Sequence, residues 1–278
     1  MRVLLVQHTT GPDPEANRAS LRAALDTAAA AAGQVDLVLL PEASQADFGT
    51  GERPPAEVAE PLGGPFTTML GEWARSQGSM VVAGMFEASP AGLPFNTLVV
   101  VDANGELRAT YRKTHLYDAF GYRESDLLSA GDPVAVTVDV PVRDDASGPA
   151  PGRAGLRVGL MTCYDLRFPE QGRALVDAGA ELLVVPAAWV RGPGKERHWS
   201  TLLAARAIEN TVFVAAVAKS GERYCGLSQV LDPMGVVLGA LADEDGSLVA
   251  DVDPRRIEQV RRVNPSLAHR RWSVAARD

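Results

Sequence analysis

The sequence predicts an α/β protein folded as a single domain. Short apolar runs rich in β-forming residues alternate with helical stretches along most of the chain, and no charged run or linker interrupts the series. At 278 residues the chain can bury one large core. Hydrophobic residues make up 46% and charged residues 22%, which is typical of a globular protein and unlike a disordered chain. We therefore expect residues 1–278 to form one domain.

The first part of the chain contains predicted strands and helices in alternation. The first helix begins where Asp13 can cap it and Pro14 takes the first helical position, and it ends at Gly33. A second helix is expected near Pro65–Gln77. The strands are expected at Val3–Gln7, Asp36–Leu40, Met80–Met85 and Thr97–Asp102, the last followed by the turn Asn104-Gly105.

The second part of the chain continues the alternation. Helices are expected at Pro169–Ala178 and Trp199–Asn210, and strands at Leu156–Thr162, Glu181–Val185, Val212–Ala218 and Gly226–Leu231. The stretch 144–155 is rich in Gly, Pro, Ala and Asp, which predicts a surface loop. Residues 254–278 are interpreted as a C-terminal extension.

A weak internal repeat links the two parts. Residues 2–6 resemble residues 157–161, and residues 35–43 resemble residues 180–188. One predicted helix lies between residues 2–6 and 35–43, and another lies between residues 157–161 and 180–188, so one strand–helix–strand unit is used twice. The alternative is that buried strands resemble one another by composition alone. A true repeat predicts two similar layers that face each other across one core.

Composition and charge exclude several function classes. The net charge of −8 and the isoelectric point near 5.1 argue against nucleic acid and anionic membranes as partners. No apolar run approaches the roughly 20 residues that span a bilayer, and the N-terminus lacks a signal-peptide pattern. Two cysteines make no disulfide framework, which favours the cytoplasm. The four histidines are scattered, so we expect no metal and no cofactor.

Cys163 is the candidate nucleophile. It lies where a predicted strand turns into a helix, a place that holds a side chain rigidly and leaves backbone N–H groups free for an oxyanion. A lone cysteine is otherwise often a small buried hydrophobic residue. The polar residues that follow the apolar strand, Tyr164, Asp165 and Arg167, favour the catalytic interpretation.

Three further charged residues are ambiguous from their local sequence. Glu42 follows the buried run Leu39-Leu40-Pro41, so it is either an exposed loop residue or a half-buried carboxylate suited to act as a base. Lys113, after a predicted strand and turn, is either a solvated lysine or a catalytic cation. The sequence around Glu124 favours neither a structural nor a catalytic role.

Together and in this order, four motifs resemble the nitrilase (carbon–nitrogen hydrolase) superfamily. They are Leu-Pro-Glu42, Arg-Lys113-Thr-His-Leu-Tyr, Arg-Glu124-Ser and Thr-Cys163-Tyr-Asp-Leu-Arg-Phe-Pro-Glu. The resemblance runs from Met1 to about Asp253 and includes Pro186-Ala187-Ala188-Trp189. It is closest to the Nit-type ω-amidases and their deaminated-glutathione-amidase relatives. Cys225-Gly226-Leu227-Ser228 departs from the family pattern.

The resemblance implies a fold and a catalytic set. The fold would be a four-layer-forming α-β-β-α sandwich that associates as a homodimer or a higher homo-oligomer. Glu42 would be the general base, Lys113 the cation beside the oxyanion, Cys163 the nucleophile, and Glu124 a second glutamate that supports Lys113. The reaction would be hydrolysis of a small carboxamide to carboxylate and ammonia through a cysteine thioester.

Substrate recognition is predicted from the residues around the nucleophile. Arg167 is expected to bind a substrate carboxylate, or else to form a salt bridge with Asp165 or Glu170. Tyr164, through its N–H at the oxyanion, and Trp189 are further expected substrate-binding residues. The favoured substrate is an ω-amide of a small dicarboxylate or keto acid, or a deaminated peptide amide.

Two other functions and one other base remain open at this point. The alternatives are an N-carbamoyl-amine hydrolase, which would also release carbon dioxide, and a non-catalytic interaction protein on the same fold. His115, two residues after Lys113, is either a structural hydrogen-bonding residue or an alternative base.

Overall fold

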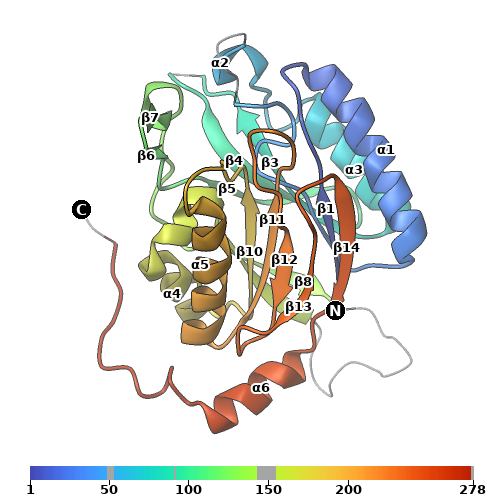
Figure 1. Ribbon diagram of the computed structural model, residues 1–278. Coiled ribbons are helices and arrows are strands. Elements are labelled where there is room, and N and C mark those ends of the chain that lie inside the picture. The colour runs from blue at the N-terminus through green and yellow to red at the C-terminus, as the bar shows by residue number, and fades with distance from the viewer. Residues whose placement is uncertain (49–52, 91, 143–154, 277–278) are drawn as a thin grey trace.

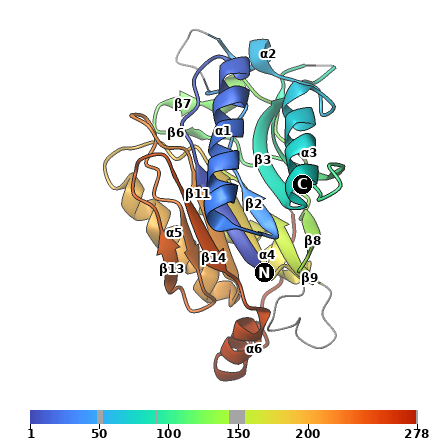
Figure 2. The same ribbon diagram turned by 90° about the vertical axis from the view of Figure 1, so that its right-hand side faces the viewer.

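Two six-stranded sheets pack face to face, and helices cover the outer face of each (Figures 1 and 2). The structure is a computed structural model that describes residues 1–48, 53–90, 92–142 and 155–276. The order of layers from one side to the other is helix, sheet, sheet, helix. This is the expected α-β-β-α sandwich.

The first sheet has the strand order β14-β1-β2-β3-β4-β5. Its strands are β1 (Arg2–Gln7), β2 (Leu37–Leu39), β3 (Met80–Glu87), β4 (Phe95–Val101), β5 (Leu107–Arg112) and β14 (Gly246–Asp251). Helices α1 (Pro14–Ala32) and α3 (Pro65–Gln77) cover its outer face, and the short α2 (Pro55–Val58) lies at one end (Figure 2). The Asp13 side chain caps α1, as predicted, by accepting from the Glu15 N–H.

The second sheet has the order β13-β12-β11-β10-β9-β8. Its strands are β8 (Thr137–Pro141), β9 (Gly155–Leu160), β10 (Leu182–Ala187), β11 (Phe213–Ala218), β12 (Gln229–Leu231) and β13 (Val237–Ala240). Helices α4 (Pro169–Asp177) and α5 (Lys195–Asn210) cover it. The remaining elements are the hairpin β6 (Asp118–Ala119) and β7 (Tyr122–Arg123), the 3₁₀ helices η1 (Glu124–Asp126) and η2 (Cys163–Arg167), and α6 (Pro254–Val263).

The two sheets repeat one pairing pattern, which confirms the internal repeat. β1 and β2 are parallel neighbours joined through α1, and β9 and β10 are parallel neighbours joined through η2 and α4. Each sheet then adds one more parallel strand and two antiparallel ones on one side, and one antiparallel strand on the other. The resemblance between residues 35–43 and 180–188 therefore reflects equivalent positions in two βαβ units.

Alternating side chains divide the core into layers. Along β1, Leu5 points into the core between the sheets, whereas Leu4 points outward against α1 and α3. In the second sheet, Leu160 points into the core between the sheets, whereas Leu183 points outward against α4 and α5. Both faces of the central strands are therefore buried, which explains why these strands read as continuous apolar runs.

The strands that the sequence did not predict include all four edge strands, β5, β8, β13 and β14. An edge strand is half exposed and carries polar residues, so its apolar pattern is weak. Val237 and Leu238 of β13 are apolar yet about half exposed. The apolar signal that marks central strands is therefore unreliable at the sheet edges.

Several predicted boundaries were wrong. Helix α5 begins at Lys195 rather than Trp199, and β12 is confined to Gln229–Leu231 because Gly226 and Leu227 have positive φ angles. The predicted loop 144–155 falls outside the described residues except for Gly155, which begins β9. The predicted C-terminal extension contains helix α6. No helix in the described part of the chain combines the length and apolar character needed to cross a membrane.

Candidate active site

The four residues predicted to be catalytic line one cavity of about 140 Å³. Glu42 follows β2, and Lys113 is the first residue after β5. Glu124 opens η1 and Cys163 opens η2. The parallel strands of each βαβ unit deliver their carboxyl ends to the same edge of the sandwich, which is why residues so distant in sequence meet there.

Cys163 sits on a strained turn between β9 and α4. Its φ angle is 48°, in the left-handed region that residues with a side chain rarely adopt. Two reciprocal hydrogen bonds hold the turn: the Asp165 N–H donates to the Thr162 carbonyl oxygen at 3.0 Å, and the Thr162 N–H donates to Asp165 Oδ2 at 2.9 Å. The turn thus presents the thiol to the cavity with little freedom to move.

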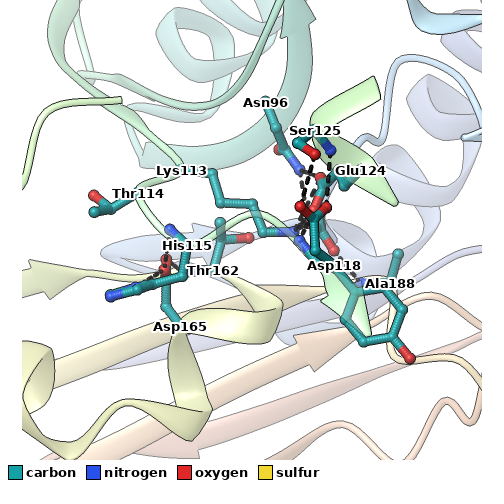
Figure 3. Close-up of polar contacts among 12 residues, drawn as sticks. Asn96, Lys113, Thr114, His115, Asp118, Glu124, Ser125, Thr162, Asp165 and Ala188 are labelled. Carbon is teal, nitrogen blue, oxygen red and sulfur yellow. Dashed lines mark hydrogen bonds and ion pairs between the residues drawn. The ribbon is translucent and has the colours of Figure 1, made fainter. Parts of the chain in front are cut away.

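The buried carboxylate of Asp165 joins this turn to the segment that carries Lys113. Tyr111 Oη donates to Asp165 Oδ2 at 2.6 Å, and the His115 N–H donates to Oδ1 at 3.2 Å. His115 Nδ1 lies 2.8 Å from the same Oδ1 (Figure 3). Its ring stacks on Phe168 with centroids 3.7 Å apart. His115 is therefore committed to Asp165, which supports the structural alternative over a role as base.

Lys113 and two glutamates form a buried ionic cluster (Figure 3). Lys113 Nζ donates to Glu42 Oε1 at 2.9 Å and to Glu124 Oε2 at 2.8 Å. Asn96 Nδ2 donates to Oε1 of both glutamates, at 2.7 Å and 3.1 Å. All three charged side chains are about 1% exposed. The cluster fixes the position of both carboxylates relative to the ammonium.

Backbone groups complete the positioning of the glutamates. The Ala188 N–H donates to Glu42 Oε2 at 2.7 Å, and the Tyr117 N–H donates to Glu124 Oε2 at 2.6 Å. Gly84 allows the approach of Glu42, because a Cβ at this glycine would lie 2.6 Å from Glu42 Cα and 2.4 Å from the Ala43 nitrogen. The sequence motif around Glu42 therefore depends on a glycine from the neighbouring strand.

The site keeps both the Lys113 amine and the Cys163 thiol in their protonated forms. Burial by itself would lower the pKa of Lys113, but the carboxylates of Glu124 and Glu42 outweigh it and hold that pKa well above its usual value. Burial, and then the Glu42 carboxylate, raise the pKa of the Cys163 thiol well above its usual value, with Lys113 acting in the opposite direction. The resting site thus holds an ammonium beside a neutral thiol that needs a base.

The three predicted substrate-binding residues, Tyr164, Arg167 and Trp189, line the same cavity. The Arg167 guanidinium carbon lies 4.8 Å from the centroid of the Trp189 ring and 6.0 Å from that of Tyr164. Among the described residues, no salt bridge joins Arg167 to Asp165 or Glu170, and its buried Nε has no hydrogen-bond partner. The alternative salt bridge is therefore not formed, and the guanidinium is left facing the cavity.

Sequence reasoning missed several residues of the site. Asn96 lies just before the predicted strand Thr97–Asp102, and a polar residue at the start of an apolar run was its only signal. Seven missed residues line the cavity without belonging to a motif that the sequence assigned to the site: Phe48, Phe120, Tyr122, Val190, Lys195, Arg223 and Tyr224. No group of three or more His, Cys, Asp or Glu side chains in the described ranges is arranged to hold a metal ion.

Comparison with known proteins places this site in a family. A family model described as carbon–nitrogen hydrolase matches residues 2–262. The chain is 40% identical over 246 residues to a deaminated glutathione amidase of Escherichia coli, with 88% of each chain covered. It is 28% identical to a solved CN-hydrolase superfamily protein of Xanthomonas campestris with an arsenic adduct in its active site, with a TM-score of 0.83 and 99% of each chain covered.

A third similar protein bears on the cysteine. The chain is 28% identical, with a TM-score of 0.77, to an amidase of Nesterenkonia sp. AN1 whose structure shows acrylamide added to the active-site cysteine. The alignment covers 97% of this chain and 99% of that one. The length of the family match, the identities and the shared fold lead to one conclusion. The chain belongs to the carbon–nitrogen hydrolase family and is an enzyme with the α/β fold of the nitrilase superfamily.

Proposed function

We propose that this enzyme hydrolyses an ω-amide of a small dicarboxylate or keto acid through a thioester on Cys163, and that Arg167 binds the free carboxylate of the substrate. The observation that carries the proposal is the Arg167 guanidinium, which lies in the same cavity as Cys163 with its Nε unpaired. A planar guanidinium binds a planar carboxylate through two parallel hydrogen bonds. The name of the E. coli relative, a deaminated glutathione amidase, supports an acidic amide as substrate.

Acylation begins with a neutral thiol. Because burial and Glu42 raise the pKa of Cys163, little thiolate exists at neutral pH and the attack requires a base. Glu42 takes the thiol proton as sulfur attacks the amide carbonyl. The Lys113 ammonium and the Tyr164 N–H stabilise the oxyanion, and Glu42 returns the proton to the departing nitrogen.

Deacylation uses the same groups, with water as the nucleophile and the thiol as the leaving group. Glu42 removes a proton from water, which attacks the thioester carbonyl, and the thiol leaves with that proton. Lys113 stays charged throughout, because Glu124 and Glu42 hold its pKa well above its usual value. It therefore serves as a fixed positive charge, and Glu124 keeps it in place when Glu42 changes its protonation state.

The assembly and location proposed for the enzyme are a homodimer in the cytoplasm. Helix α5 supports a dimer because its apolar residues point in two directions. Leu203 is buried in the core, whereas Ile208 is 48% exposed beside the turn at Met234. Light scattering at micromolar concentration tests the dimer, and a stable monomer would contradict it.

A panel of small amides tests the activity. Wild-type protein is incubated with ω-amides of dicarboxylates and keto acids, with neutral amides of equal length, and with N-carbamoyl amines. The expected result is release of ammonia and a free acid from the acidic amides, at a kcat/KM above that of the neutral ones. Release of carbon dioxide together with ammonia from the carbamoyl compounds alone would instead assign the carbamoyl-hydrolase alternative.

A further inference from the structure

Lys195 is a second cation in the active-site cavity, and the family motifs do not account for it. Its side chain is buried, with 9% of the residue exposed, and it lines the cavity that contains Cys163. Its Nζ donates to Tyr117 Oη at 2.6 Å, which is a neutral acceptor. Among the described residues, no carboxylate lies within ion-pair distance of this ammonium. Burial of a charge without an opposite charge is unfavourable, so the site is incomplete without an anion.

The backbone of Lys195 is held in place by the residue that supports Arg167. Trp189 Nε1 donates to the Lys195 carbonyl oxygen at 2.8 Å, while the face of the Trp189 ring lies under the Arg167 guanidinium. Gly192 and Gly194, with φ angles of 158° and 73°, form the turn that brings Lys195 to the start of α5. The two cations therefore have a defined spacing, set by one tryptophan.

Phe120 meets both cations at the rim of the cavity. Its ring centroid lies 4.6 Å from Lys195 Nζ and 5.7 Å from the guanidinium carbon of Arg167. Phe120 has a φ angle of 55° and forms the β6–β7 turn with Gly121, yet its residue is 66% exposed. A large apolar residue held in this uncommon conformation at the opening thus contacts both cations. Its ring is suited to pack against the carbon chain of a ligand that joins two anionic groups.

The charges of the cavity do not balance without a ligand. The carboxylates of Glu42 and Glu124 are already bound to Lys113. Arg223 has Asp47 as a distant partner at 3.9 Å. Arg167 and Lys195 are left without a carboxylate among the described residues, in a chain whose formal net charge is −8. Two such cations in one cavity fit a ligand with two anionic groups.

We propose that Lys195, with the Tyr117 hydroxyl, is a second anion-binding site that determines substrate specificity, and that it binds a carboxylate on the amine portion of the amide. This rests on the proposed function. There, Arg167 holds the free carboxylate of the acyl portion and Cys163 faces the carbonyl, so the substituent on nitrogen is the only part of the substrate left to carry another charge. In this case the C–S bond forms first, the C–N bond of the tetrahedral intermediate then breaks to leave the thioester, and the thiol proton leaves on an amine that carries a carboxylate in place of ammonia.

Two isosteric amides test the proposal. Both share one dicarboxylic acyl group; one is the N-carboxymethyl amide and the other the N-isobutyl amide, which has the same shape without the second charge. A charge-assisted hydrogen bond predicts a kcat/KM for the charged amide at least about tenfold higher in the wild type. In Lys195→Met this ratio should fall to about one, through a higher KM for the charged amide.

Three further variants separate charge from structure. Lys195→Arg keeps the positive charge and should retain most of the preference, and Tyr117→Phe, which loses only the hydroxyl, should reduce it. Arg191→Met is the matched control, because Arg191 belongs to the same loop but pairs outside the cavity with Asp243. It should leave the ratio at the wild-type value. Added salt should raise the KM of the charged amide more than that of the isobutyl amide.

The outcomes distinguish this proposal from the one on which it rests. A wild type that hydrolyses both amides with equal kcat/KM would overturn the second anion site and leave the role of Arg167 intact. Equal losses on both amides in Tyr117→Phe and Lys195→Met would assign these residues a structural role and overturn the proposal as well. A wild type that hydrolyses no acidic amide would overturn the proposed function, and the second site with it.

Discussion

The Ala188 N–H donates a 2.7 Å hydrogen bond to Oε2 of Glu42, so the end of a strand in the second sheet holds the proposed base of the first. These residues come from the two copies of the internal repeat, in which Pro41 corresponds to Pro186. Equivalent strand ends therefore meet across the sandwich. One copy supplies the carboxylate and the other supplies the backbone donor that orients it.

Cys163→Ala tests the nucleophile. We expect amide hydrolysis to fall by at least about 10⁴-fold, because no other group in the cavity can form the thioester. The free energy of unfolding should change by only about 1 kcal/mol, because one small buried group is removed. Circular dichroism and ammonia release measure the two effects. Cys225→Ala is the control, since Cys225 lies outside the cavity lining, and unchanged activity in Cys163→Ala would overturn the mechanism.

Arg167→Lys tests carboxylate binding. Lysine keeps the charge but loses the planar fork, so the KM for acidic ω-amides should rise roughly ten- to a hundredfold, and that for neutral amides much less. Arg157→Lys is the control, because Arg157 pairs with Asp139 on an exposed edge of the second sheet. Equal losses for acidic and neutral amides would mean that Arg167 only shapes the turn after Cys163.

Glu42→Gln separates the reactivity of the thiol from turnover. Burial is the main cause of the raised Cys163 pKa, and the Glu42 carboxylate is the next, so removing that charge should lower the pKa. The rate of alkylation by iodoacetamide should then reach half its maximum at a lower pH than in the wild type. Amide hydrolysis should instead fall about 10²- to 10⁴-fold, because the base is lost.

Mass spectrometry of the labelled peptides gives the alkylation rates at each pH. Glu170→Gln, the same substitution on the exposed first turn of α4, should leave both the profile and the turnover unchanged. In the wild type Cys163 should be labelled before Cys225, which is fully buried and whose pKa burial raises to about 12. If half-maximal alkylation of Glu42→Gln occurs at the same pH as in the wild type or at a higher one, the Glu42 carboxylate does not raise the pKa of Cys163.

The raised pKa of the buried Cys225 thiol predicts that the protein loses stability in alkaline solution. Its folded pKa of about 12 lies above the ordinary value of 9.0, so above pH 9 the unfolded chain releases a proton that the folded chain retains. The free energy of unfolding should therefore decrease between about pH 9 and pH 12, by up to roughly 1.4 kcal/mol per pH unit from this group. Urea unfolding of the wild type and of Cys225→Ala at several pH values isolates this contribution. A difference between the two proteins that stays constant with pH would contradict it.

Gly84→Ala tests the close approach behind Glu42. The added Cβ would meet backbone atoms of Glu42 and Ala43, which cannot move aside as a flexible side chain can. We expect a loss of about 1–3 kcal/mol in the free energy of unfolding and a lower kcat, because Glu42 is displaced. Gly63→Ala is the control, since a Cβ there meets nothing within 4 Å. Wild-type kcat in Gly84→Ala would show that Glu42 tolerates this shift.

The sequence by itself determined the central strands, the helices α1, α3, α4 and α5, the repeat and the motif residues. Strands buried on both faces need continuous apolar runs, and the turn after β9 needs its polar residues, so these features depend on local physical demands. Residues 35–43 and 180–188 therefore predicted two equivalent strands before any contact was known. Glu42, Lys113, Glu124 and Cys163 were predicted differently, from motifs whose order resembles that of the nitrilase superfamily.

Only the tertiary structure decided which residues share the cavity and how they are charged. Asn96, Ala188 and Gly84 act through contacts between distant segments, and no local pattern encodes such a contact. The edge strand β5 escaped prediction because its exposed polar residues leave no continuous apolar run. The pKa of Cys163 and the isolation of Lys195 from any carboxylate also follow from burial and from neighbours brought together by folding. A free energy that depends on such neighbours cannot be read from a residue and its flanks.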